Sequence, residues 1–347
     1  MHQRSVILSP YALPPGCRRV RRLARSVAIV AGLLAMSHQA GRSSSGDALG
    51  ATESAISRAT QWLGTVRLDP FSGGAPSFRT YTTEADTWHR LWVFETDPER
   101  RRVLERVVIE RLGRVLDPEQ LERLLAGPDG STMLTEIAVL ASRSREHGLD
   151  PRALREALSA RRGMVLAEIG RVPPSIRALY GAYLPSAGLD PPFSLEECRR
   201  TGMLAARPRE IDFGLADVYY LTHELFAYTD YAMQPLQGLP EVERTYLLRV
   251  LPFWTLFYAL LNNLDVTAEL VACLHAAGMR DTYAYREGIR VVLECQNPDG
   301  SFGAPSSRTL GRPAQPADFL HPTMNCLTAL LLERASLRRS ADPGGSH

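Results

Sequence analysis

Apolar residues recur along most of this chain at the spacing of an α-helix, and the alternating patterns that predict β-strands are nearly absent. From Ala51 onward one helical pattern follows another, with clear breaks at residues 127–130 and 185–192. Residues 241–261 are hydrophobic on almost every side, which is typical of a central helix. We therefore expect an all-α fold in which this helix is buried and is kinked or split at Pro252.

The other helices are predicted from apolar faces and from Pro, Asp and Gly near their ends. His89 is expected at the surface of its helix, and the last helix is expected to begin near His321. The predicted ranges are 56–66, 84–94, 98–115, 118–125, 132–147, 151–158, 163–169, 175–183, 219–230, 264–276 and 281–295.

One predicted helix, 219–230, carries polar side chains in an aromatic setting. Buried polar groups are costly unless they are paired, so these residues form either a satisfied network or a site. His223 and Asp230 share a helix face, but roughly 10 Å of helix separates them, so they could line one pocket without binding the same ion. We expect both to be catalytic, and we expect substrate contacts from Tyr220, Phe226, Tyr228 and Trp254.

Composition excludes several classes of chemistry. The chain has 347 residues, of which 45% are hydrophobic, and this is enough to bury a large core in one domain. It contains no lysine, so pyridoxal phosphate cannot be held as a Schiff base and a nucleotide cannot be held by a P-loop lysine. A net charge of +2 gives no argument for a nucleic-acid partner. The five cysteines lack C-x-x-C spacing, which favours reduced thiols over zinc ribbons or disulfides.

The ends of the chain are expected to lie outside the domain. Arginines and a short apolar run in residues 18–34 resemble a signal peptide, although the run is too short to span a membrane as a helix. Alternatively, translation starts at Met36, and we then expect a cytoplasmic protein rather than an exported one. We expect a tail at 1–50 that ends in a Ser/Gly linker, a domain at 51–337 and a disordered tail at 338–347.

The stretch Gln296-Asn297-Pro298-Asp299-Gly300-Ser301-Phe302 resembles the repeat ending of the prenyltransferase and squalene cyclase superfamily. The motif Thr-His-x-x-Phe-x-x-Thr-Asp in residues 222–230 is similar to a bacterial family of unknown function with a fold of that kind. These resemblances imply a single-domain α/α toroid of about six helix pairs, in which inner helices surround a central cavity.

The same resemblance implies where a metal could bind. Proton-initiated cyclases of the superfamily use a D-x-D-D motif and ionising terpene synthases use D-D-x-x-D, and neither motif occurs in this chain. Its protein prenyltransferases bind zinc through Asp, Cys and His, whereas here Cys273 lies two turns beyond Asp265. Asp265 and Glu269 stand at i, i+4 spacing, and with His321 they could hold zinc or a similar divalent metal, with His223 as a fourth candidate. The alternatives are that the carboxylates pair with arginine and that His321 caps the last helix.

Three functions fit these patterns. The first is a transferase, lyase or cyclase of natural-product metabolism, with or without a metal, that acts on a hydrophobic, isoprenoid or peptide-derived substrate. The second is a binding module for a hydrophobic ligand, and the third is a scaffold that binds a partner protein. The oligomeric state is left open.

Overall fold

The computed structural model describes residues 45–127, 133–304 and 313–341, and almost all regular structure in these ranges is helical. The only strand-like pairing there is an isolated antiparallel bridge between Gln296 and Phe302. The elements are α2 Ser45–Thr65, α3 Gly74–Val93, α4 Pro98–Arg114, α5 Pro118–Leu125, α6 Leu134–Glu146, α7 Arg152–Ala160, α8 Arg162–Arg171, α9 Pro174–Tyr183, η2 Leu184–Ala187, α10 Leu195–Thr201, α11 Met203–Ala206, η3 Glu210–Asp212, α12 Leu215–Thr229, α13 Glu241–Leu260, α14 Leu264–Ala276, α15 Tyr283–Glu294 and α17 Pro316–Ala341.

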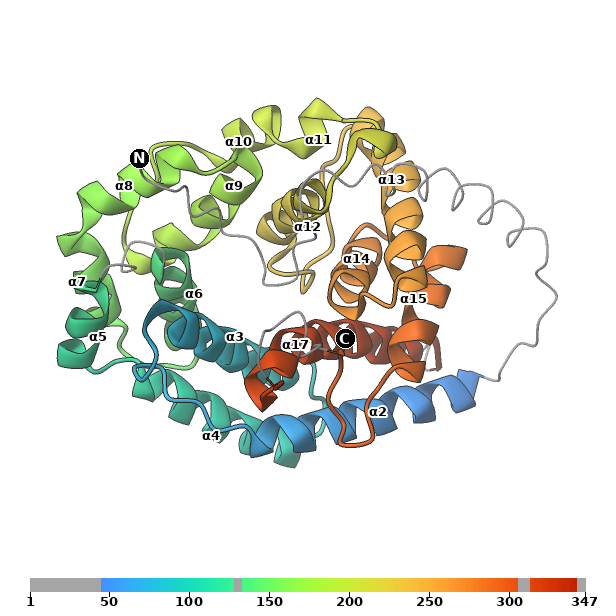
Figure 1. Cartoon of the computed structure of the whole chain (residues 1–347), viewed down its shortest axis with the longest axis horizontal. Coiled ribbons are helices and arrows are strands. Elements are labelled where there is room, and N and C mark those ends of the chain that lie inside the picture. The colour runs from blue at the N-terminus through green and yellow to red at the C-terminus, as the bar shows by residue number, and fades with distance from the viewer. Residues whose placement is uncertain (1–44, 128–132, 305–312, 342–347) are drawn as a thin grey trace.

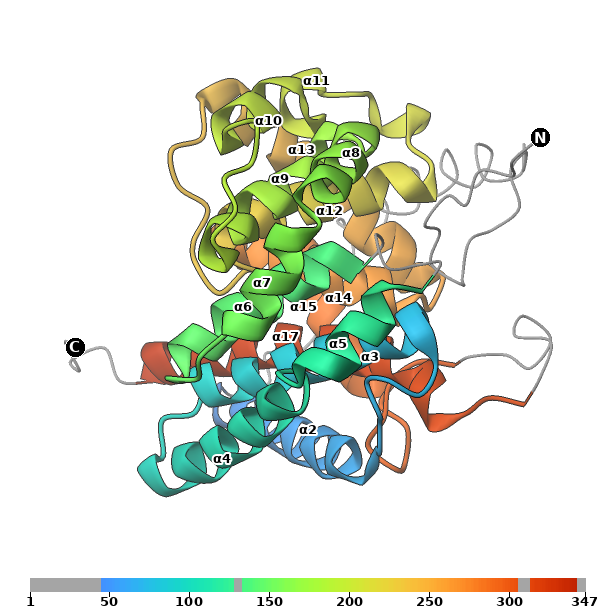
Figure 2. The ribbon, with the colours of Figure 1, turned by 90° about the vertical axis from the view of Figure 1, so that its left-hand side faces the viewer.

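A series of helices closes on itself in the middle of the molecule. In chain order α3, α6, α9, α12, α14 and α17 each pack against the next, and α17 packs against α3. The helices that alternate with them, α4, α7, α10, α13 and α15, lie outside the series, and α2 covers α17 (Figure 1). Figure 2 shows the same arrangement from the side, with α2 and α4 at one end of the view and α10 and α11 at the other. The all-α prediction is confirmed.

Local sequence explains where several helices begin. Asp97 accepts a hydrogen bond from the Arg100 amide at the start of α4, and Asp117 does the same for the first turn of α5. Each is followed by proline, which suits the first position of a helix because its missing N–H would have no partner there. The predicted bounds of α5 and α14 agree with the structure.

Three predicted boundaries were wrong, and two short helices were missed. Helix α2 begins at Ser45, inside the expected linker, where Asp47 favours a helix start. Helix α3 begins at Gly74 rather than Glu84, because Phe78 and Tyr81 of its first turns are fully buried. Helix α17 continues to Ala341, into the expected disordered tail, where Arg338 pairs with α2. The short helices α10 and α11 were not predicted.

Proline does not interrupt α13, which was expected to be kinked or split. The helix is continuous across Pro252, and its core residues are buried as predicted. Proline cannot donate to the carbonyl of Leu248, but Leu248 lies on the exposed side of the helix, where water can satisfy that oxygen.

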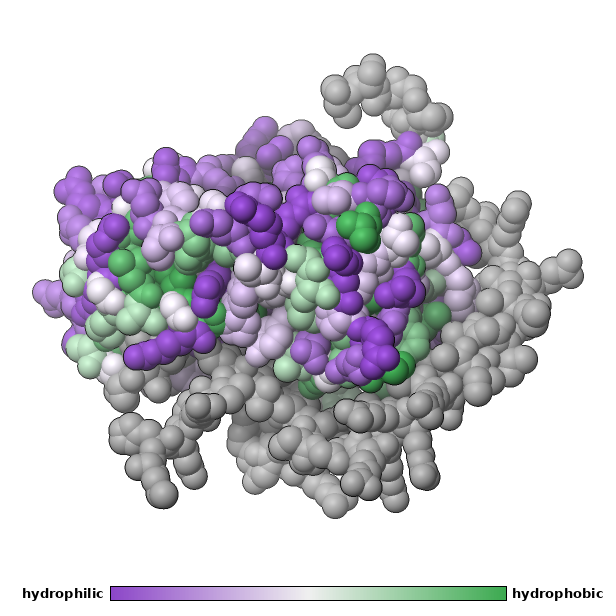
Figure 3. All heavy atoms as spheres, turned by 90° about the horizontal axis from the view of Figure 1, so that it is seen from above, coloured by the Kyte–Doolittle hydropathy of each residue, from purple (hydrophilic) through white to green (hydrophobic). Residues whose placement is uncertain are grey.

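Two expectations from the composition concern membrane-spanning helices and the state of the cysteines. No helix in the described ranges is long and apolar enough to cross a membrane, and hydrophilic side chains are spread between apolar ones on the face shown in Figure 3. The cysteines that the structure describes, Cys198, Cys273, Cys295 and Cys326, are free thiols. The signal-like segment and Met36 lie outside the described residues.

Candidate metal centre

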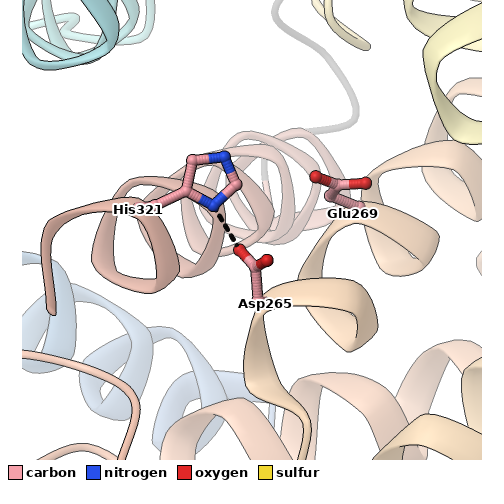
Figure 4. Close-up of side chains that lie close together, drawn as sticks. All are labelled: Asp265, Glu269 and His321. Atoms are coloured by element: carbon pink, nitrogen blue, oxygen red, sulfur yellow. Dashed lines mark hydrogen bonds and ion pairs between the residues drawn. The ribbon is translucent and has the colours of Figure 1, made fainter. Parts of the chain in front are cut away.

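Two helices bring together the three predicted metal ligands. Asp265 and Glu269 lie one turn apart on α14, and His321 lies in the second turn of α17, which packs against α14. His321 Nδ1 lies 2.7 Å from Asp265 Oδ1 (Figure 4). One potential ligand atom from each of the three residues lies within 4.8 Å of the other two. His321 therefore does not cap α17, which begins at Pro316, a full turn before it.

Three further side chains hold the two carboxylates in place. Asn325 Nδ2 donates to Asp265 Oδ1 at 2.8 Å and to Glu269 Oε1 at 3.1 Å. Tyr219 Oη donates to Asp265 Oδ2 at 2.9 Å, and Thr222 Oγ1 donates to Glu269 Oε2 at 2.8 Å. Thr222 belongs to the motif noted in the sequence, whereas Tyr219 and Asn325 were not selected, although Asn325 follows His321 by one helical turn and faces the same way. Hydrogen bonds of this kind orient the ligands of protein-bound metals.

The two carboxylates are buried without a guanidinium partner. Asp265 is 4% exposed and Glu269 is 3% exposed, whereas the His321 side chain is 51% exposed. Among the described residues, neither carboxylate forms an ion pair with arginine. Four other buried carboxylates do: Glu84 with Arg111, Asp86 with Arg90 and Arg143, Glu95 with Arg334, and Glu243 with Arg199. The main alternative to metal binding, in which Asp265 and Glu269 pair with arginine, is therefore not seen in the described part of the chain.

Glu224 is the exception among the remaining buried carboxylates. It is fully buried on α12, and its Oε2 accepts hydrogen bonds from Ser175 Oγ at 2.8 Å and from the Met203 amide at 2.6 Å. Met203 is the first residue of α11, so Glu224 meets the positive end of a helix instead of a cation. Asp265 lies in the first turn of α14, near the positive end of that helix, and the basic side chain that pairs with it is His321.

The charges of the three residues depend on one another. Burial and the neighbouring Asp265 carboxylate together raise the pKa of Glu269 to about 8. Burial opposes ionisation of Asp265 as well, but the charge of His321 and three hydrogen bonds hold its pKa below the usual value. Burial opposes protonation of His321, yet Asp265 raises its pKa to about 9. Near neutral pH the site holds an Asp265–His321 ion pair beside a largely protonated Glu269, so a second positive charge is needed for both carboxylates to ionise.

His223 lies next to this cluster. Its ring is half-buried, 6.0 Å from the ring of Tyr219 and 6.1 Å from that of Phe226. Burial lowers the pKa of His223 to about 4, and the charges of His321 and Asp265 also act on it. His223 is thus a neutral imidazole beside the three candidate ligands.

Asp230 lies in a different network. It follows α12 with φ of 46°, and its carboxylate accepts hydrogen bonds from Arg143 Nη2 at 2.9 Å and from Tyr183 Oη at 2.8 Å. Arg143 also binds Asp86, which in turn binds Arg90. Burial opposes ionisation of Asp86, but the two arginines hold its pKa well below the usual value. Asp230 is therefore one acid of a charge-balanced network rather than a neighbour of His321.

The predicted substrate contacts lie on different faces. Phe226 is buried between His223 and Tyr231. Tyr220 is half-buried and lies one turn before Glu224 on the same face of α12. The Tyr228 hydroxyl points to the carbonyl of Leu195 at 3.5 Å. Of the four, the structure brings only Phe226 next to the candidate metal centre.

Trp254 is a core residue of α13. It is 2% exposed and stacks on Phe213 at 5.7 Å. His89, expected at the surface, is 1% exposed and shares a hydrogen bond with His147 at 3.0 Å. The burial of Trp254 agrees with the predicted central helix, whereas helical periodicity did not predict that His89 is buried, since it does not say which face meets a neighbouring helix.

Two pockets in the described part of the chain lie away from these residues. One, of about 220 Å³, opens between α13 and α15, and the other, of about 350 Å³, is lined by α7 and by residues around Gly188. Neither is lined by a candidate ligand, so the predicted central cavity stays a prediction.

Comparison with known proteins gives one match. Residues 86–322, which include all three candidate ligands, match the family model described as domain of unknown function DUF6895. No curated protein and no solved structure matches the chain. The likeness of residues 296–302 to the prenyltransferase and cyclase superfamily therefore rests on that motif alone. The match covers more than half of the sequence, and the chain belongs to the DUF6895 family.

Proposed function

We propose that this protein is a metal-dependent enzyme in which Asp265, Glu269 and His321 bind a divalent cation such as zinc. One observation carries the proposal: two buried carboxylates without an arginine lie within 4.8 Å of an imidazole nitrogen. Two oxygens and one nitrogen suit zinc with an open coordination position. The exposed side of His321 gives solvent and small molecules access to that position.

A bound zinc ion would supply a Lewis acid and an activated water at neutral pH. The chain's own residues have supporting tasks. Asn325 fixes the spacing of the two carboxylates, while Tyr219 and Thr222 hold their outer oxygens. His223, a neutral imidazole beside the site, could accept a proton from a reacting group. Asp230 anchors the neighbouring turn through Arg143, a task in place of the catalytic one first expected.

We further propose that the closed series of helices is an α/α toroid and that the substrate is a small hydrophobic or peptide-derived molecule of natural-product metabolism. The alternation of inner and outer helices supports the toroid. The aromatic rings of Tyr219 and Phe226 around His223 support a substrate with apolar parts. Binding of a hydrophobic ligand or of a partner protein without catalysis remains the alternative function.

Elemental analysis of the purified protein tests the proposal. Wild-type protein should contain about one equivalent of metal per chain, and Asp265→Asn and His321→Ala should lose most of it. Glu224→Gln is the matched control, because it changes a buried carboxylate of a neighbouring helix and should keep the metal. Metal-free wild type after reconstitution with zinc, or equal metal content in all variants, would overturn the proposal.

A further inference from the structure

The turn after α12 has an unusual backbone. Asp230, Tyr231 and Ala232 have φ of 46°, 53° and 66°. This left-handed region is unfavourable for residues that carry a side chain, and non-glycine residues normally visit it singly. In the described ranges the other two such residues, Arg207 and Asn262, do occur singly.

Hydrogen bonds hold this turn from several sides. Arg143 and Tyr183 bind the Asp230 carboxylate. The Tyr231 amide donates to the carbonyl of Phe226 at 3.0 Å, and the Ala232 amide donates to Thr229 Oγ1, also at 3.0 Å. Glycine would adopt the same backbone with less strain. A strained backbone that is kept in place by neighbouring residues often belongs to a functional site, so we asked what the side chains of this turn do.

The turn fixes the ring of Tyr231. The Arg90 guanidinium lies 4.6 Å from the ring centre, and the rings of Phe226 and Tyr183 lie at 5.3 Å and 6.0 Å. Tyr231 is nevertheless half-buried rather than buried, and its hydroxyl has no hydrogen-bond partner among the residues that the structure describes. A ring held on several sides with an unpaired hydroxyl is a donor already ordered for a ligand.

Tyr231 is also connected to the candidate metal centre. Phe226, which contacts Tyr231, contacts His223 as well. Arg90, which lies over Tyr231, is one of the charges that act on His321. Tyr231 is thus linked to the surroundings of His321 by ring contacts along α12 and by the charge of Arg90 on α3.

We propose that Tyr231 contacts the substrate and that its hydroxyl donates a hydrogen bond to a carbonyl or carboxylate oxygen at the end of the substrate remote from the metal. This inference rests on the proposed metal centre. The ligand atom is an oxygen because a donating phenol hydroxyl needs an acceptor, and carbonyl and carboxylate oxygens are common acceptors of such bonds. The strained turn is retained because it sets the position of this donor.

Hydroxamates provide a test, since their head group binds zinc and cobalt. The probes are acetohydroxamate, monohydroxamates of straight-chain dicarboxylic acids of increasing length, and alkyl hydroxamates of equal length. Affinities are measured by titrating the cobalt-loaded protein and following its visible absorption. At one chain length the terminal carboxylate should improve affinity by about tenfold over the alkyl control, as expected for one hydrogen bond to a charged group.

Tyr231→Phe should abolish this gain and leave the affinity for acetohydroxamate unchanged. Tyr228→Phe is the matched control and should keep the gain, because its hydroxyl points toward Leu195. Absence of a gain at every chain length, or a gain that survives in Tyr231→Phe, would overturn the inference while leaving the metal centre intact. Failure of acetohydroxamate itself to bind would overturn the metal centre and this inference with it.

Discussion

Replacing Glu224 by glutamine should stabilise the protein at alkaline pH. Burial raises the pKa of Glu224 to about 7 from an ordinary value near 4.5, although hydrogen bonds from Ser175 and from the amides of Met203 and Leu204 oppose the rise. The folded state therefore holds this proton more tightly than the unfolded state. The stabilisation is fully present below about pH 4.5 and is lost as the pH rises toward 7.

The size of the effect follows from the shift of the pKa. The pKa of Glu224 is about 2.5 higher in the folded state than in the unfolded state, which corresponds to about 3 kcal/mol. This is the cost of ionising Glu224 in the folded protein above pH 7. Glutamine keeps the acceptor oxygen for Ser175 and Met203 but cannot ionise. We expect Glu224→Gln to match the wild type near pH 4.5 and to be more stable by up to about 3 kcal/mol at pH 8.

Urea unfolding followed by circular dichroism at several pH values measures this difference. The comparison with wild type removes the contributions of all other groups that titrate in both proteins. Glu99→Gln is the control, because the Glu99 side chain is 79% exposed and its loss should change stability little at any pH. A difference between Glu224→Gln and wild type that does not vary with pH would refute this reasoning.

The other predictions concern packing. Arg143→Met should lower the free energy of unfolding by about 3 kcal/mol, because the 3% exposed guanidinium pairs with three carboxylates. Arg102→Met, in an exposed ion pair, should cost well under about 1 kcal/mol. Equal urea midpoints for the two variants would contradict this. Gly300→Ala should lower stability by about 3 kcal/mol, since φ is +97° and the new Cβ would lie 2.4 Å from the Arg58 carbonyl oxygen. Gly238→Ala is the control: φ is +65°, but no atom lies within 4 Å of the new Cβ, so only the smaller cost of the backbone conformation is expected. Thermal unfolding of both variants measures the difference.

The sequence predicted most of the helices and predicted which residues share a face of α14. Asp265 and Glu269 could be placed together because a spacing of four fixes their relation on any helix. Their meeting with His321 depended on α17 packing against α14, which the family resemblance implied and periodicity alone does not predict.

Faces of α12 were harder to assign. His223 and Asp230 share a face, but the helix ends at Thr229 and the following left-handed turn directs Asp230 to Arg143. Tyr228 was expected to contact the substrate, yet its hydroxyl points toward the carbonyl of Leu195 at the start of α10. Apart from Arg90, which follows Asp86 by four residues on α3, the arginine partners of the buried acids come from other helices, so local patterns could not identify them.

Anomalous X-ray diffraction from crystals grown with zinc tests the central claim most directly. We predict one strong anomalous peak about 2.0–2.2 Å from His321 Nδ1 and from one oxygen each of Asp265 and Glu269. Crystals of His321→Ala provide the comparison and should show a much weaker peak. A wild-type map with no peak among these three residues, or with its main peak elsewhere in the protein, would contradict the account.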